Sequence, residues 1–151
     1  MNKIALTTIL LCLFTGSLLC AQTDSTGTVE IEVQRIRSSE GQIAIGMNTS
    51  SKGWPRKAEF IYQWAKDGLK DSVLIVQIND LAYGTYAISM MDDVNSDFKL
   101  DMFLGIPREA YGFSMNPKNR LRAPKFDECS FELNQPFLKL YITLKYPGKD
   151  K

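Results

Sequence analysis

The chain has 151 residues, of which 44% are hydrophobic and 23% charged, and its formal net charge is +1. This length suits one domain with a sizeable core, and the near-neutral charge argues against nucleic acid or an anionic bilayer as a partner. Histidine is absent from the sequence, which excludes Ser-His-Asp and Cys-His nucleophilic catalysis and histidine-containing metal sites, but leaves carboxylate chemistry and oxygen-ligated metals.

The N-terminus has the layout of a secretory signal peptide. Lys3 precedes an uncharged apolar run over residues 4–20, and a small residue, Ala21, is followed by a polar segment. We therefore expect residues 1–21 to be removed and residues 22–151 to form a single secreted or periplasmic domain. A membrane-anchoring helix is the alternative, but the run is short for a span, so no transmembrane span is expected in the mature chain.

A lipid anchor on Cys20 is less favoured, because Leu19 stands where lipoprotein signals have a small residue. Cleavage after Ala21 removes one basic residue and no acidic one, which leaves the mature side chains with balanced charge. It also leaves Cys129 as the only cysteine, so an internal disulfide is excluded. Cys129 lies on the apolar face of an expected strand, which predicts a buried, unreactive thiol.

Short segments with alternating apolar and polar residues recur along the mature chain, each bounded by turn residues. Residues 28–36 and 42–48 flank a turn at 38–41 and are expected to form a hairpin. Residues 73–80 are apolar on both faces and are expected to form a central strand. Residues 50–72 fit either a short helix or a loop-strand-loop. The other expected strands are residues 85–91, 126–133 and 137–146, and residues 105–125 read as a long irregular loop region. The pattern predicts an all-β fold, an antiparallel β-sandwich of about seven strands.

An acidic loop follows the expected strand 85–91. Of the alternate positions between residues 93 and 101, all but Lys99 carry a side-chain oxygen, as in loops that ligate calcium. The pattern departs from an EF-hand at Phe98, where that loop has glycine, and at Leu104, where it has glutamate. It is compatible with a shorter calcium loop at a strand end, in which Lys99 would contribute its backbone carbonyl. The candidate ligands are Asp93, Asn95, Asp97, Lys99, Asp101 and Glu109.

Two alternatives need no metal. The basic residues of segment 117–125 could neutralise the carboxylates as an internal clamp, or the loop could be a solvated acidic turn. A further alternative uses two of the carboxylates as the acid and base of a hydrolase acting on carbohydrate. Tyr111 and Phe113 are candidate ligand-binding residues, because they stand on the irregular segment beside the acidic loop.

The segments "GTYAISMMDDVNSDFKLDMFLGIPREAYGFSMN" and "APKFDECSFEL" resemble the secreted bacterial family known as domain of unknown function 2141. The resemblance covers residues 27–146 and implies a secreted or periplasmic β-sandwich without an assigned activity. It departs from the family pattern at Asp92, where members usually have histidine, and at Phe98, where they usually have glycine. The matching motif positions are Asp93, Asn95, Asp97, Leu100, Asp101, Gly105, Ile106, Pro107, Glu109, Tyr111, Gly112, Phe113 and Ser114.

Together these features predict a secreted or periplasmic, non-catalytic module in which calcium in the acidic loop holds the segment with Tyr111 and Phe113 for an extracellular or envelope ligand. The carboxylate-based hydrolase is the alternative.

Overall fold

The computed structural model describes residues 25–104, 106–118 and 122–147, and these residues are almost entirely strands and loops. One 3₁₀ turn, η1 (Phe126–Glu128), interrupts them. The strands are β1 (Thr26–Gln34), β2 (Gln42–Asn48), β3 (Phe60–Ala65), β4 (Val73–Ala82), β5 (Gly84–Asp93), β6 (Met102–Phe103), β7 (Ile106–Pro107), β8 (Tyr111–Phe113), β9 (Ser130–Leu133) and β10 (Phe137–Thr143).

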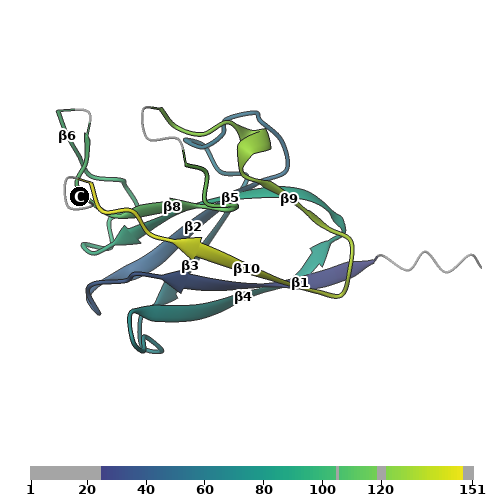
Figure 1. The fold of residues 1–151 in the computed structure, drawn as a ribbon, viewed down its shortest axis with the longest axis horizontal. Coiled ribbons are helices and arrows are strands. Elements are labelled where there is room, and N and C mark those ends of the chain that lie inside the picture. The colour runs from purple at the N-terminus through teal and green to yellow at the C-terminus, as the bar shows by residue number, and fades with distance from the viewer. Residues whose placement is uncertain (1–24, 105, 119–121, 148–151) are drawn as a thin grey trace, which may run out of the picture.

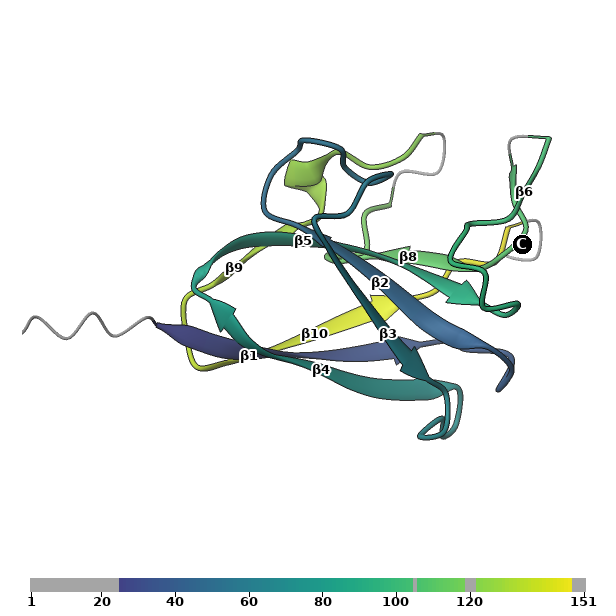
Figure 2. The same ribbon diagram turned by 180° about the vertical axis from the view of Figure 1, so that it is seen from behind.

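The longer strands form two sheets that face each other (Figures 1 and 2). One has the order β10-β1-β4, and the other has the order β3-β2-β5-β8, with β9 also paired to β5. Strands β6 and β7 form a separate small hairpin. The predicted all-β sandwich is confirmed, and each of the six segments expected as strands contains a strand.

The core lies between the two sheets and follows from the alternation along their central strands. In β1, Val29, Ile31 and Val33 are fully buried, while the intervening residues face outwards. Ile43, Ile45 and Met47 of β2 are equally buried in the facing sheet. Each such side chain contributes about 1.5–3 kcal/mol by leaving water, so this layer supplies much of the stability.

The expected hairpin between residues 28–36 and 42–48 is wrong, because β1 and β2 belong to different sheets. Strand β1 pairs antiparallel with β4 and parallel with β10, whereas β2 pairs with β3 and β5. The connection crosses between the sheets at Ile36, which is buried and donates its N–H to the carbonyl of Ser72 at 3.0 Å. Two strands with one apolar face each can lie in facing sheets, or they can pair within one sheet. Both arrangements bury the apolar faces, so the alternation of residues does not distinguish them.

Strand β4 is an edge strand rather than the expected central one, and Ile75 on its outer face is 54% exposed. The ambiguous segment 50–72 is a loop-strand-loop that contains β3. The parallel pair β1–β10 is the exception to the expected antiparallel pairing.

The outer faces of the two sheets differ in chemistry. On the three-stranded sheet, Lys139 Nζ lies 3.3 Å from Glu30 and 3.1 Å from Glu32. That face therefore carries charged groups, together with the half-exposed apolar side chains of Ile75, Phe137 and Tyr141. On the five-stranded sheet, the outward positions of β2 and β5 include the small residues Ala44, Gly46 and Ser89. Loops rise over this second face in two groups (Figure 1), and the space between them forms the candidate site.

Candidate functional site

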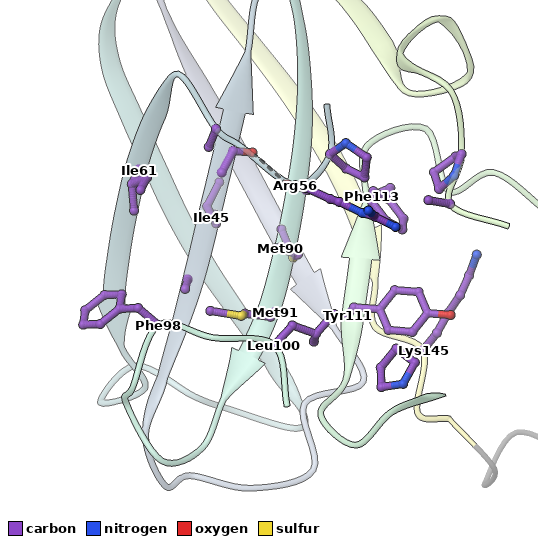
Figure 3. Close-up of a pocket in the computed structure, with 18 of the residues that line it drawn as sticks. Ile45, Arg56, Ile61, Met90, Met91, Phe98, Leu100, Tyr111, Phe113 and Lys145 are labelled. Atoms are coloured by element: carbon purple, nitrogen blue, oxygen red, sulfur yellow. Dashed lines mark hydrogen bonds between the residues drawn. The ribbon is translucent and has the colours of Figure 1, made fainter. Parts of the chain in front are cut away.

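The candidate site is an open groove of about 620 Å³ on the outer face of the five-stranded sheet (Figure 3). Its volume lies within the range of about 300–1,000 Å³ found for sites that bind small organic molecules. It is lined by Ala44, Ile45, Gly46, Pro55, Arg56, Ala58, Ile61, Ser89, Met90, Met91, Phe98, Leu100, Met102, Pro107, Tyr111, Phe113, Pro117, Arg122, Ala123, Pro124 and Lys145.

The floor is hollow because the side chains on it are small. Gly46 and Ser89 are register partners on β2 and β5, and Ala44 lies two residues along the same face. A Cβ atom on Gly46 would lie 2.9 Å from Cβ of Ala58, so the β2–β3 loop packs closely over this strand. The outward face of an exposed strand is usually polar. The small, mostly apolar residues at the outward positions of β2 and β5 are therefore a feature of the sequence from which the groove could have been predicted.

One wall of the groove consists of the β2–β3 loop, residues 49–59, and the described part of the β8–β9 loop, residues 114–118 and 122–129. Trp54 joins them, since its Nε1 donates to the carbonyl of Pro124 at 3.0 Å. The Trp54 ring also lies 5.9 Å from the ring of Phe113 and 6.0 Å from that of Phe126, at the tilted and edge-on angles that aromatic pairs prefer. The two loops therefore support each other.

The described part of the acidic loop, residues 94–104 and 106–110, forms the opposite wall, and the buried carboxylate of Asp93 organises its first turn. One oxygen of Asp93 accepts the N–H of Asp97 at 3.1 Å, and the other accepts the N–H of Phe98 at 3.2 Å and the amide of Gln42 at 2.8 Å. Asn95 and Asp97 make similar short-range bonds to the N–H groups of Asp97 and Lys99, at 3.2 and 2.8 Å. In this turn, side-chain oxygens accept the backbone N–H groups in place of the carbonyls of a neighbouring strand.

Glu109 closes the base of the acidic loop. Its two carboxylate oxygens accept the N–H groups of Val94, at 3.2 Å, and Asp101, at 3.3 Å, which are the two ends of the first turn. Burial raises the pKa of Glu109 above its ordinary value of 4.5, and the nearby Asp93 and Asp101 charges add to the shift, while the two N–H groups oppose it. Glu109 therefore stabilises the acidic loop by joining Val94 to Asp101.

Phe98, which stands where the EF-hand loop has glycine, has a φ of +62°. A bulky residue seldom adopts this left-handed conformation, because its Cβ crowds the backbone. The ring of Phe98 is 50% exposed and lines the groove. Backbone strain of this kind is often retained where a side chain is needed at a functional surface.

The motif YGFS has a different structural task at each position. Tyr111 and Phe113 point outwards from β8 and line the groove, with their rings 5.9 Å apart. Gly112 points inwards, where a Cβ would lie 2.8 Å from Cγ2 of Ile142 in the other sheet. Ser114 is buried, and its Oγ accepts the N–H of Ile88, which continues the pairing of β5 between β8 and β9. The structure thus places both candidate ligand-binding residues in the groove; that they bind a ligand stays a prediction.

The structure spreads the candidate metal ligands along the acidic loop. Asp93 and Glu109 are buried, whereas Asn95, Asp97 and Lys99 are exposed and Asp101 is partly exposed. Within the described residues, no three acidic, histidine or cysteine side chains lie close enough together to hold a metal ion. Asn95 and the backbone carbonyls of the loop are further oxygen ligands for a cation, and calcium binding stays a prediction.

The described part of the basic segment 117–125 forms none of the ion pairs with the acidic loop that the clamp alternative would require. Arg122 instead pairs with Glu128, with nitrogen–oxygen distances of 3.0 and 3.1 Å, and the N–H of Lys125 also bonds to Glu128. These interactions keep the segment within its own wall of the groove.

A buried acidic residue with a basic partner is found outside the acidic loop, at Asp92 of β5. Lys66 Nζ forms an ion pair with Asp92, and the two residues are only 4% and 2% exposed. The Tyr146 hydroxyl donates to the other Asp92 oxygen at 3.1 Å, and burial raises the pKa of Tyr146 to about 12. Asp92 is the departure from the family's usual histidine, and here it joins β5, β3 and the C-terminal segment.

Cys129 is buried as expected, and its burial raises the pKa of the thiol to about 12. The predicted signal peptide and Cys20 lie outside the described residues. No helix within the described residues is long and apolar enough to cross a membrane.

The fold and the site define an all-β protein of two facing sheets, one of which carries a loop-bounded apolar groove. The chain belongs to the family described as "Uncharacterized protein conserved in bacteria", domain of unknown function 2141, which it matches over residues 31–138. The resemblance noted from its motifs is thereby confirmed. No curated protein and no solved structure matches the chain.

Proposed function

We propose that this protein is a non-catalytic binding module that holds a small apolar ligand in the groove of the five-stranded sheet. The shape and the lining of the groove carry this proposal. It is a hollow of about 620 Å³ over small floor residues, and most of the residues that line it are apolar. An apolar concavity with few polar groups is the usual form of a site for a small molecule.

The hydrolase alternative receives no support from this groove. A glycosidase needs two carboxyl groups that face each other across the bound sugar. No aspartate or glutamate is among the described residues that line the groove. Asp93 and Glu109 use their oxygens to hold loop N–H groups instead.

We also propose that the acidic loop takes calcium and that the mature chain acts outside the cytoplasm. The spacing of Asp93, Asn95, Asp97 and Asp101 supports the first statement, because oxygens that already accept an N–H keep a second lone pair for a cation. The layout of residues 1–21 supports the second. The ion would stiffen the wall that carries Phe98 and Leu100.

The test is binding of a neutral apolar fluorophore, N-phenyl-1-naphthylamine, whose emission rises in apolar surroundings. We expect it to bind the protein and to lose binding in Ser89→Trp, which fills the floor, and to bind more weakly in Ile61→Glu. Ile61 is 70% exposed, so the second variant should fold normally. Ile75→Trp, on the outer face of the other sheet, is the matched control and should bind as the wild type does. No binding to the wild type, or equal binding to all variants, would refute the groove as the site.

A further inference from the structure

We infer that the ligand of this groove is a single-chain amphiphile with an anionic head group, such as a long-chain carboxylate. This inference rests on the proposed function and assigns the chemical class of the ligand. It follows from how the apolar and cationic side chains are distributed along the groove.

The groove is apolar at one end and cationic at the other (Figure 3). Ile61 and Phe98 lie at one end, with 70% and 50% of their surfaces exposed. Arg56 and Lys145 lie at the other end, beside Tyr111 and Phe113. A ligand with an alkyl chain and an acidic head would cover the exposed apolar surface and place its charge near the basic side chains.

The charges on the lining have one sign. Arg56, Arg122 and Lys145 are basic, and none of the described lining residues is acidic. Arg122 is largely neutralised by its two-fold contact with Glu128. Arg56 is exposed, and no carboxylate among the described residues lies within ion-pair distance of it. Because a guanidinium stays protonated at any physiological pH, Arg56 offers a permanent positive charge to a ligand.

The floor favours an alkyl chain over a peptide strand. Strand β2 is paired on both sides, with β3 and β5, and β5 is paired with β2 and with β8 and β9. Their backbone N–H and C=O groups are therefore engaged in ladders and cannot bind an added strand. What the floor presents is the surface of Ala44, Gly46, Ser89 and Met91, to which methylene groups are suited.

The experiment displaces the bound fluorophore with three amphiphiles that share a dodecyl or dodecanoyl chain, each below its micelle-forming concentration. These are dodecanoate, dodecyl maltoside and dodecyltrimethylammonium. We expect dodecanoate to compete best and the cation to compete least, with the preference shrinking as salt is added. Arg56→Gln should weaken dodecanoate about tenfold and leave dodecyl maltoside unchanged. Arg56→Lys should retain part of the preference.

Lys57→Gln is the matched control, since it removes the same charge from the neighbouring exposed residue, which does not line the groove. It should bind dodecanoate as the wild type does. Equal competition by all three amphiphiles, or an equal loss in Arg56→Gln and Lys57→Gln, would overturn the anionic head group while leaving the groove as a binding site. Failure of the fluorophore and of every amphiphile to bind would overturn the groove itself, and the inference with it.

Discussion

Asp92, Lys66 and Tyr146 form a buried polar network in which each member depends on the others. An ion pair with this little exposure loses hydration on folding and regains the cost only while both charges and the hydrogen bonds are present. The network joins one end of β5 to the chain after β3 and to the C-terminal segment. The ion pair itself adds little to the free energy of unfolding, whereas removing one of its two charges leaves the other buried and unpaired, which is strongly destabilising.

Lys66→Met should lower the free energy of unfolding by about 3–5 kcal/mol, because Asp92 would remain buried without a counter-charge. The double variant Lys66→Met, Asp92→Asn should recover most of this loss, since a neutral amide oxygen can still accept the Tyr146 hydroxyl. Urea denaturation of both variants measures the difference. A double variant no more stable than Lys66→Met would contradict the account.

Glu109 and Glu128 are two glutamates whose surroundings shift their pKa values in opposite directions. Burial raises the pKa of Glu109, whereas the hydrogen bonds from Arg122, followed by that from the backbone of Lys125, lower the pKa of Glu128. In a carboxyl-carbon NMR titration, Glu109 should titrate above 4.5 and Glu128 below it. A pKa of Glu109 below that of Glu128 would show that the carboxyl group of Glu109 is solvated and not buried.

The sign of the effect on stability follows from linkage. A folded pKa above 4.5 means that the native state holds this proton more tightly than the unfolded chain does. The contribution of Glu109 is therefore greatest below pH 4.5 and declines as the pH rises through the folded pKa. Glu109→Gln should remove this part of the pH dependence, and Asp67→Asn, an exposed control outside the loop, should leave it unchanged.

At the scale of the elements, Gly112 sets how closely β8 approaches the opposite sheet. Gly112→Ala should lower the free energy of unfolding by about 1–3 kcal/mol, because the new Cβ would lie 2.8 Å from Ile142 and 3.3 Å from Met90. Gly84→Ala is the control, since its nearest side-chain atom is 3.8 Å away, and it should be neutral. Denaturant midpoints compare the two, and equal midpoints would refute the packing argument.

Binding of calcium to the acidic loop is tested by melting. With calcium at ten times its dissociation constant, we expect about 1.4 kcal/mol of added stability, or a rise of several degrees over the chelated protein. Asp97→Ala should abolish the rise, and Asp67→Ala should keep it. A melting temperature that does not respond to calcium would leave the loop held by its own hydrogen bonds alone.

Alternation along the chain predicted the strands well, and β2 has the predicted bounds. The pairing of strands could not be predicted, because Val29, Ile31 and Val33 of β1 have the same pattern whether their strand lies beside β2 or opposite it. The acidic loop and the YGFS motif were recognised, but the groove was not. Its floor is made of residues such as Ala44 and Ser89, which carry no chemistry of their own and matter only through their position between the two walls.

Across the whole molecule, the five-stranded sheet and the two loop walls have different structural roles. The sandwich supplies a rigid floor, Trp54 fixes one wall through Pro124, and Asp93 and Glu109 fix the other. Both walls are attached to the five-stranded sheet. A change in either wall should therefore alter ligand affinity without changing the core.

The parallel pairing of β1 with β10 has a consequence for how the chain acquires its structure. These strands stand at opposite ends of the described sequence, and the Thr143 hydroxyl bonds to Gln34 across 109 residues. A fold with such distant contacts has a high contact order and should refold over milliseconds to seconds. Stopped-flow tryptophan fluorescence measures this rate, and refolding within microseconds would contradict it. In a chain that is exported as proposed, the three-stranded sheet would be completed only after β10 has crossed the membrane, because β1 pairs with β10 as well as with β4.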